Sequence, residues 1–100
     1  MNIGIIGKGF VGNAIAESYK GHNVSFYDPF KMGSVESIGD LCHCIAIFIC
    51  VPTPKAEDGR CDTSIVESTL QALVDEQYVG LVIAKSTAPF EIYERFAEKL

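Results

Sequence analysis

The sequence predicts an α/β fold in which a parallel sheet of about four strands is flanked by helices. Short apolar runs alternate with amphipathic segments along the chain, which is the pattern of strands joined by right-handed helical crossovers. A glycine-rich turn follows the first apolar run, and polar motifs follow the later ones. In sheets of this class ligands bind at the carboxyl ends of the strands, so we expect the functional residues there.

Composition limits the class of protein and its partners. The chain has 100 residues, of which 48% are hydrophobic and 21% charged, with a formal charge of −5. These values favour one folded domain over residues 1–100 and argue against disorder. The acidic balance without a Lys/Arg cluster argues against nucleic acid as a partner. No apolar run approaches a membrane span of roughly 20 residues, and no secretory signal is evident, so we expect no membrane partner and a cytoplasmic location.

The first half of the predicted sheet comes from two short apolar runs. Residues 2–7 are apolar and end in glycine, which indicates a buried strand. Residues 10–20 show helical spacing of apolar residues, with Gly21 suited to follow the helix. Residues 23–28 predict the second strand, and Pro29 stops it.

The remaining strands follow in the second half of the chain. Residues 31–41 are expected to form a loop with one short helix over 35–41. Residues 45–51 are the most apolar stretch and suit a central parallel strand. Residues 81–84 predict a fourth strand, and residues 90–100 a last amphipathic helix.

A further helix is expected between the third and fourth strands. Asp62 or Ser64 is suited to cap it, and Ser64 with Glu67 fits a capping box. Its apolar stripe is traced by Val66, Leu70, Leu73 and Gln77.

The turn after the first strand carries a glycine motif. It reads Gly7-Lys8-Gly9-Phe10-Val11-Gly12, which matches G-x-G-x-x-G between a strand and a helix. Gly7 permits a tight turn, Gly9 leaves room for a pyrophosphate, and Gly12 lets the helix approach the sheet. The helix N-terminus supplies N–H donors and positive dipole potential for phosphates. The motif predicts a Rossmann-like sheet, truncated relative to a full dinucleotide-binding domain; the alternative is a turn that is only structural.

An acidic residue lies at the end of the second strand. Asp28 is suited to accept hydrogen bonds from the adenosine ribose hydroxyls and to repel a 2′-phosphate. The sequence therefore favours NAD over NADP. Lys31 either contacts the ribose or a phosphate, or is simply solvated.

Two further motifs follow the third and fourth strands. Val51-Pro52-Thr53-Pro54 predicts a stiff loop that either holds the Thr53 hydroxyl at the sheet edge or is only a rigid turn. Lys85-Ser86-Thr87-Ala88-Pro89 predicts a turn into a helix, in which Ser86 or Thr87 caps the helix and presents a hydroxyl to the crevice. We expect Lys85 to point to solvent or to a partner.

Together these motifs resemble one family, the UDP-glucose/GDP-mannose 6-dehydrogenases, in the first part of the NAD-binding domain. The resemblance rests on the glycine turn, Asp28, residues 48–54, Asp58-Gly59 with Asp62-Thr63-Ser64, and residues 85–89. The family oxidises the C6 alcohol of a nucleotide sugar to a carboxylate in two NAD-dependent steps through a covalent bond to a cysteine.

The resemblance implies a set of cofactor-binding residues. They are Gly7, Gly9, Phe10, Val11 and Gly12 for the pyrophosphate, Asp28 for the ribose, and Val51, Pro52, Thr53, Ser86 and Thr87 against the cofactor, with Thr87 nearest the reacting centre. The family's catalytic cysteine lies in a motif far beyond residue 100, so no catalytic residue is expected here apart from a supporting role for Thr87. The stretch 28–45 is shorter than is usual in the family, and Phe90-Glu91 departs from its pattern.

The cysteines do not predict a metal site. Cys42 and Cys44 form only a C-x-C pair, which lacks the usual spacing of zinc ligands. Cys50 lies within the apolar third run, where we expect it to pack as a small hydrophobe. Neither these nor Cys61 sits in a motif typical of the family's nucleophile.

Two hypotheses follow. In the first, the chain is the NAD-binding portion of a nucleotide-sugar dehydrogenase, without turnover alone and binding the nucleotide sugar only when a catalytic half is supplied. In the second, it is a stand-alone dinucleotide-binding or protein-interaction module. A sheet that stops after four strands leaves an open edge where a second copy can pair.

Overall fold

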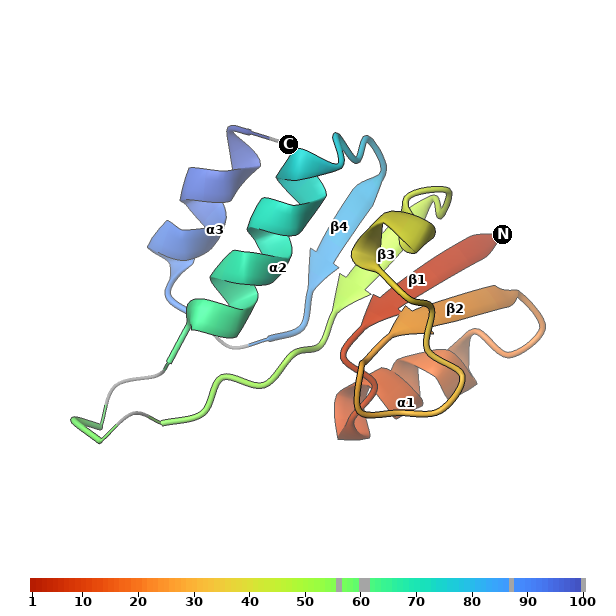
Figure 1. Ribbon diagram of the computed structural model, residues 1–100, viewed down its shortest axis with the longest axis horizontal. Helices are drawn as coiled ribbons and strands as arrows, with labels where there is room; N and C mark the ends of the chain where they lie inside the picture. Colours follow the sequence, from red (N-terminus) through yellow and green to blue (C-terminus); the bar gives the residue numbers. More distant parts are fainter. Residues whose placement is uncertain (56, 60–61, 87, 100) are drawn as a thin grey trace.

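The sheet has the predicted parallel architecture (Figure 1). The computed structural model describes residues 1–55, 57–59, 62–86 and 88–99. Its four strands lie in the order β2-β1-β3-β4 and all pair in parallel. They are β1 (Asn2–Ile6), β2 (Asn23–Tyr27), β3 (Ala46–Ile49) and β4 (Leu81–Ala84).

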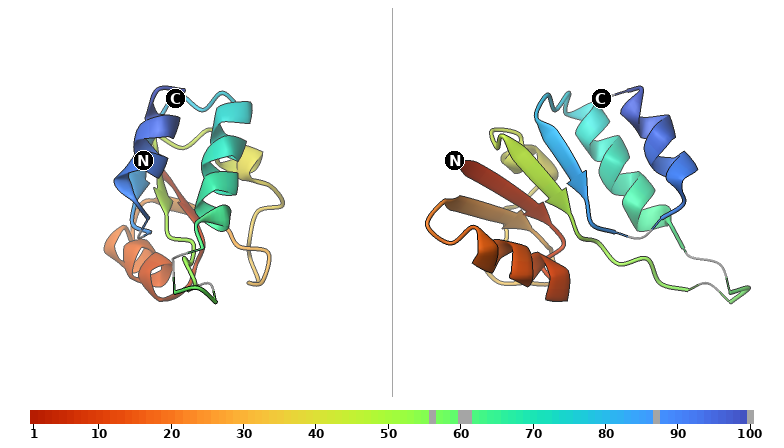
Figure 2. Two further views of the ribbon diagram at one scale, coloured as in Figure 1. Left: turned by 90° about the vertical axis from the view of Figure 1, so that its left-hand side faces the viewer. Right: turned by 180° about the vertical axis from the view of Figure 1, so that it is seen from behind.

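Helices cover both faces of this sheet, as Figure 2 shows from two further sides. α1 (Phe10–Ser18) packs on one face, and α2 (Ser64–Asp75) lies on the other with a short 3₁₀ helix, η1 (Ile38–Leu41). α3 (Phe90–Ala97) lies beside α2, beyond β4. The predicted short helix over 35–41 is present as the 3₁₀ helix η1, which begins three residues later than predicted.

The strand order places a switch point between β1 and β3. From β1 the chain passes to β2 on one side, and it then crosses to β3 on the other side. In sheets of this kind, a ligand crevice opens outside the carboxyl ends of the strands at that point. The register pairs Ile6 with both Tyr27 and Ile49, so these strand ends are level.

The core follows the two-residue alternation of the strands. Ile3, Ala46 and Phe48 face α1, whereas Ile6, Ile47 and Ile49 face α2 and η1. The central strand β3 is buried on both faces, as its unbroken apolar sequence predicts. From α2, the stripe residues Val66, Leu70 and Leu73 are buried in the second layer.

Several element boundaries differ from the prediction. β1, β2 and α3 each end before the predicted residue, at Ile6, Tyr27 and Ala97. β3 ends at Ile49, because the prolines that soon follow cannot donate to a ladder; Cys50 makes one last bond, from its N–H to the Ile6 carbonyl at 2.8 Å. α2 ends at Asp75, so Gln77 lies outside it with a φ of 56°. α1 ends at Ser18 rather than at residue 20.

Of the two residues suggested as caps of α2, the structure uses Asp62 and not Ser64. Thr63 is the N-cap residue, and the Asp62 carboxylate accepts the Ser64 N–H at 2.9 Å. Glu67 accepts hydrogen bonds from Arg95 of α3 and from the Thr63 hydroxyl, and these two bonds lower the pKa of its carboxyl group. The ion pair between Arg95 and Glu67 thus links α3 to the first turns of α2.

Across the described residues, no helix combines the length and the apolar character that crossing a bilayer requires.

Candidate functional site

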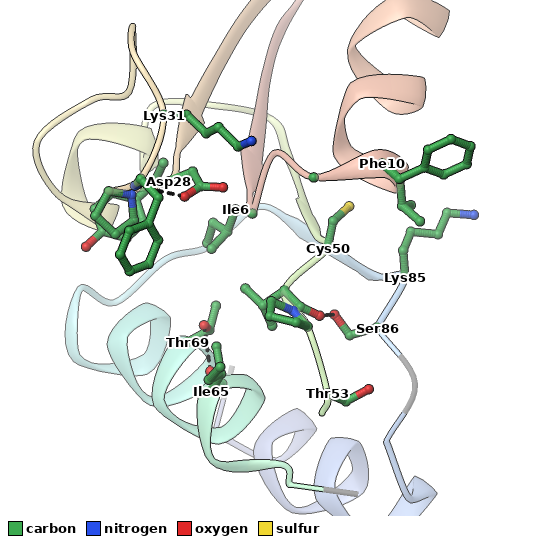
Figure 3. A pocket seen from close by; sticks show the side chains of 18 residues that line it. Ile6, Phe10, Asp28, Lys31, Cys50, Thr53, Ile65, Thr69, Lys85 and Ser86 are labelled. Atoms are coloured by element: carbon green, nitrogen blue, oxygen red, sulfur yellow. Dashed lines mark hydrogen bonds between the residues drawn. The ribbon is translucent and has the colours of Figure 1, made fainter. Parts of the chain in front are cut away.

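A cavity of about 730 Å³ opens at the carboxyl ends of the strands (Figure 3). Its walls come from the ends of all four strands, the first turn of α1 and the first turns of α2. The lining residues are Ile6, Gly7, Gly9, Phe10, Val11, Tyr27, Asp28, Pro29, Phe30, Lys31, Cys50, Val51, Pro52, Thr53, Ile65, Thr69, Lys85 and Ser86.

Most residues that the sequence selected come together in this cavity. Those that line it are Gly7, Gly9, Phe10, Val11, Asp28, Lys31, Val51, Pro52, Thr53 and Ser86. Gly12 does not line the cavity but lies buried beneath it in α1. Thr87 falls outside the described residues.

The glycine turn needs two of its glycines for backbone reasons. Gly7 has a φ of +89°, and a Cβ there would lie 2.8 Å from the Cys50 carbonyl oxygen. A Cβ at Gly12 would lie 2.3 Å from the Gly7 carbonyl oxygen. Both positions therefore keep α1 and β3 close to the end of β1.

Gly9 differs from these two because its absent side chain faces open space. A Cβ built there meets no atom within 4 Å, and Gly9 lines the cavity. Gly9 is also the N-cap of α1, where no side chain accepts a first-turn N–H and no acidic residue occupies the first turn. The free donors and the positive helix end are thus available to an anion in the cavity.

The backbone holds Asp28 firmly in the cavity wall. One carboxylate oxygen accepts the Lys8 N–H at 3.0 Å, and the other accepts the Phe30 N–H at 3.1 Å. A carboxylate offers about four lone-pair sites, so each oxygen retains capacity for one hydroxyl donor. This geometry suits a vicinal diol. Figure 3 shows the Lys31 side chain beside Asp28, extending toward the α1 side of the cavity.

The two proline-containing loops are tied together on the far side of the cavity. The Ser86 hydroxyl donates to the Val51 carbonyl at 2.8 Å, and the Tyr93 hydroxyl of α3 donates to the Ser86 carbonyl. The predicted helix cap by Ser86 is therefore wrong: α3 has Pro89 as its N-cap residue, without a side-chain hydrogen bond. Ser86 fixes one loop to the other instead.

Several lining residues were missed by the sequence reasoning. Tyr27 and Cys50 lie near the ends of predicted strands, and that position alone could have marked them as lining residues. Ile65 and Thr69 come from the face of α2 next to its buried stripe, which no motif marks. Lys85, expected to point to solvent or to a partner, is exposed but also lines the cavity. The others are Ile6, Pro29 and Phe30.

Cys50 lies at the switch point and not within β3, which corrects its expected place inside the strand. It packs partly against the apolar layer under α1. Burial raises the pKa of its thiol, and the positive charge of Lys85 opposes that rise. The thiol is thus mainly protonated at neutral pH.

The described residues hold no cluster of three or more His, Cys, Asp or Glu side chains that is suited to bind a metal ion. Cys61 lies outside the described residues.

The cavity as a whole fits a dinucleotide. Its volume lies in the usual range for small-molecule sites. It combines a side-chain-free approach to helix donors at Gly9 with a carboxylate at the end of the neighbouring strand β2. These are the two recognition elements that a diphosphate and a ribose require.

Comparison with known proteins agrees with this geometry. The profile of the UDP-glucose/GDP-mannose dehydrogenase family, NAD binding domain, matches residues 34–100. The glycine turn and Asp28 precede the matched range, so the match is independent of them. No curated protein matches the chain.

Two solved structures show the same fold. One is a UDP-D-ManNAc dehydrogenase from Pyrococcus horikoshii, with 20% identity and a TM-score of 0.77 over 99% of this chain. The other is a UDP-glucose dehydrogenase from Pyrobaculum islandicum, with 24% identity and a TM-score of 0.76 over 98% of this chain. The chain spans about a third of their length, 32% in each case.

Proposed function

Because the chain belongs to the UDP-glucose/GDP-mannose dehydrogenase family and forms part of its NAD-binding domain, we propose that the cavity at the strand ends binds NAD. We further propose that it does so for the oxidation of a nucleotide sugar. The observation that carries this proposal is the joint presence of Gly9, the uncapped start of α1 and Asp28 in one cavity.

Each recognition element has a defined role in the proposed complex. The N–H groups at the start of α1 donate to the diphosphate, and Gly9 permits their close approach. Asp28 accepts hydrogen bonds from the adenosine ribose hydroxyls. The nicotinamide nucleoside of NAD faces the wall toward β3 and β4. This wall is formed by Val51, Pro52, Thr53 and Ser86. When bound, NAD accepts a hydride from the substrate alcohol.

The oxidation itself requires residues beyond this chain. We propose that the nucleophilic cysteine and the nucleotide-sugar site are supplied by a further portion of the protein or by another chain, because 32% of each related structure is matched here. The nucleotide sugar is then a partner of the complete assembly, and residues 1–100 alone bind NAD without turnover.

NAD titration by isothermal calorimetry tests the central proposal. Saturable binding of one NAD per chain is expected. The absence of heat at millimolar NAD, together with unchanged amide chemical shifts, would overturn it. A second assay with UDP-glucose should show no NADH formation, and NADH formation by the isolated chain would refute the absence of turnover.

Replacing Asp28 with Asn is expected to weaken NAD binding about tenfold, because a charged acceptor of the ribose hydroxyls becomes a neutral amide. Affinity for NADP should rise relative to NAD, since repulsion of the 2′-phosphate is removed. Parallel titrations of both cofactors measure the ratio. Asn has nearly the same shape as Asp but keeps only one accepting oxygen for the Lys8 and Phe30 N–H groups, so the thermal unfolding midpoint must be measured as the control for folding. An unchanged NAD-to-NADP ratio would show that Asp28 does not face the ribose.

A second role, as an interaction module, is favoured by the exposed edge of the sheet. The outer edge of β2 is covered, because the Val35 N–H donates to the Phe26 carbonyl at 2.9 Å. β4 uses the N–H groups of Leu81 and Lys85 to pair with β3, so the alternate residues present theirs outward. Leu81 is 61% exposed beside this edge. We propose that a second copy pairs there; a monomeric mass by light scattering at high concentration would contradict it.

We propose further that residues 1–100 fold as one domain, because both apolar layers share one sheet. A cytoplasmic location is proposed from the free thiols of Cys42, Cys44 and Cys50, which suit a reducing compartment. Two separate unfolding transitions would contradict the single domain. Recovery of the protein from an extracytoplasmic fraction would contradict the cytoplasmic location.

A further inference from the structure

Lys85 occupies a place in the cavity that its sequence position does not reveal. Its N–H donates to the Ile49 carbonyl at 2.8 Å, which fixes its backbone to the end of β3. Its side chain lines the same cavity as Phe10 and Val11. Figure 3 shows it rising toward Phe10, the first residue of α1, with its ammonium directed outward on the side of the cavity away from Asp28. A cation therefore stands next to the helix end that receives phosphate in the proposed function.

Lys31, which follows β2, and Lys85, which follows β4, both line the cavity. In the described part of the chain, the ion pairs join Lys20 to Glu17 and Arg95 to Glu67, and neither involves Lys85. Lys8 places its ammonium over the Phe26 ring, 4.2 Å from the centroid. Lys85 thus has its charge available for a ligand. In a chain with a net charge of −5, a local cation strongly affects whether an anion enters.

The strand order indicates which part of a dinucleotide Lys85 meets. Asp28 ends β2 and Lys85 follows β4, so they lie on opposite sides of the glycine turn after β1. The charge of Lys85 acts on the Cys50 thiol, which lies between them at the end of β3. A ligand with its ribose at Asp28 and its first phosphate at α1 extends its second phosphate toward β3 and β4. That phosphate approaches Lys85.

We propose that Lys85 is a binding residue for the second phosphate of the dinucleotide, the one on the β4 side of the cavity. This inference rests on the proposed function and adds to it a charged contact outside the glycine turn. A flexible ammonium suits this role, because it acts as a point charge that follows the phosphate as the ligand settles.

The test compares Lys85→Gln with Lys20→Gln by calorimetric titration of NAD, ADP-ribose and AMP. Both variants remove one positive charge, but Lys20 follows the C-terminal end of α1 and does not line the cavity. Lys85→Gln is expected to weaken NAD and ADP-ribose about fivefold and to change AMP, which lacks the second phosphate, less than twofold. Lys20→Gln should leave all three unchanged. NAD affinity should also depend less steeply on salt in Lys85→Gln than in the wild type.

The outcomes separate this inference from the proposed function. If the wild-type chain binds no NAD, both are overturned. If it binds NAD and Lys85→Gln binds NAD equally well, only the role of Lys85 is overturned. An equal loss for AMP, or tighter NAD binding by the variant, would likewise overturn it, because the charge would then not act on the second phosphate. Because Lys85 is exposed, an unchanged unfolding midpoint is expected and excludes misfolding as the cause.

Discussion

Replacing Gly12 with Ala is expected to lower the free energy of unfolding by about 3 kcal/mol, the upper part of the range for overpacked sites. The added Cβ would lie 2.3 Å from the Gly7 carbonyl oxygen and 3.4 Å from a methyl group of Ile5. The nearer atom belongs to the backbone of the β1–α1 turn and has no rotamer by which to move away. α1 must therefore shift outward and lose packing against the layer formed by Ile3, Ala46 and Phe48.

Helix propensity alone predicts the opposite sign for this substitution. Gly12 lies inside α1, and Gly to Ala in a helix interior normally stabilises by roughly 0.5–1 kcal/mol. Asn13→Ala provides the matched control, because Asn13 is the next residue of the same helix and is exposed. Chemical denaturation of the three proteins measures the difference. A Gly12→Ala variant as stable as Asn13→Ala would show that α1 does not press on the turn as closely as described.

The fold was largely predictable because its determinants are local. Apolar runs with glycine or proline at their ends mark the strands, and an unbroken run marks the doubly buried β3. The sequence did not show at which residue each strand or helix begins or ends. Cys50 is as apolar as its neighbours, yet β3 ends at Ile49 and the Cys50 N–H makes the last bond before the proline-containing loop. The sequence offered both Asp62 and Ser64 as caps of α2 and did not decide between them; the Asp62 carboxylate accepts the Ser64 N–H, and Ser64 is the first helical residue.

The candidate site likewise contains some residues that local sequence predicts and others that it does not. Gly9 and Asp28 were predicted because a motif with fixed spacing specifies their chemistry. Ile65 and Thr69 were not, since only the tertiary approach of α2 to the strand ends brings them to the cavity. Ser86 was expected at the crevice and lines the cavity, but its predicted role as a helix cap is wrong. Its hydroxyl bonds to the carbonyl of Val51, which is 35 residues away in the chain. Contacts of that range are absent from any local pattern.

Replacing Gly9 with Ala is expected to weaken NAD binding about a hundredfold while the protein remains folded. The methyl group meets no atom of the chain within 4 Å. The φ of −84° is an ordinary value, whereas the ψ of −147° lies outside the main allowed regions, so a small backbone adjustment is expected. The methyl group instead projects into the space where the diphosphate would approach the first N–H groups of α1. Losing one hydrogen bond to a charged group costs about 1.5–3 kcal/mol, which corresponds to roughly ten- to hundredfold in affinity.

The comparison of Gly9→Ala with Gly12→Ala separates binding from stability within one motif. Gly9→Ala should lower the free energy of unfolding by about 1 kcal/mol, from the loss of glycine at the N-cap and from the ψ of −147° there, whereas Gly12→Ala should lower it by about 3 kcal/mol. Calorimetric NAD titration and denaturant unfolding of both variants, with Asn13→Ala as reference, give the two quantities. Wild-type affinity in a folded Gly9→Ala protein would mean that the diphosphate does not approach α1 at Gly9. The anion would then have to be held elsewhere along the cavity, and the role of the helix end would be lost with it.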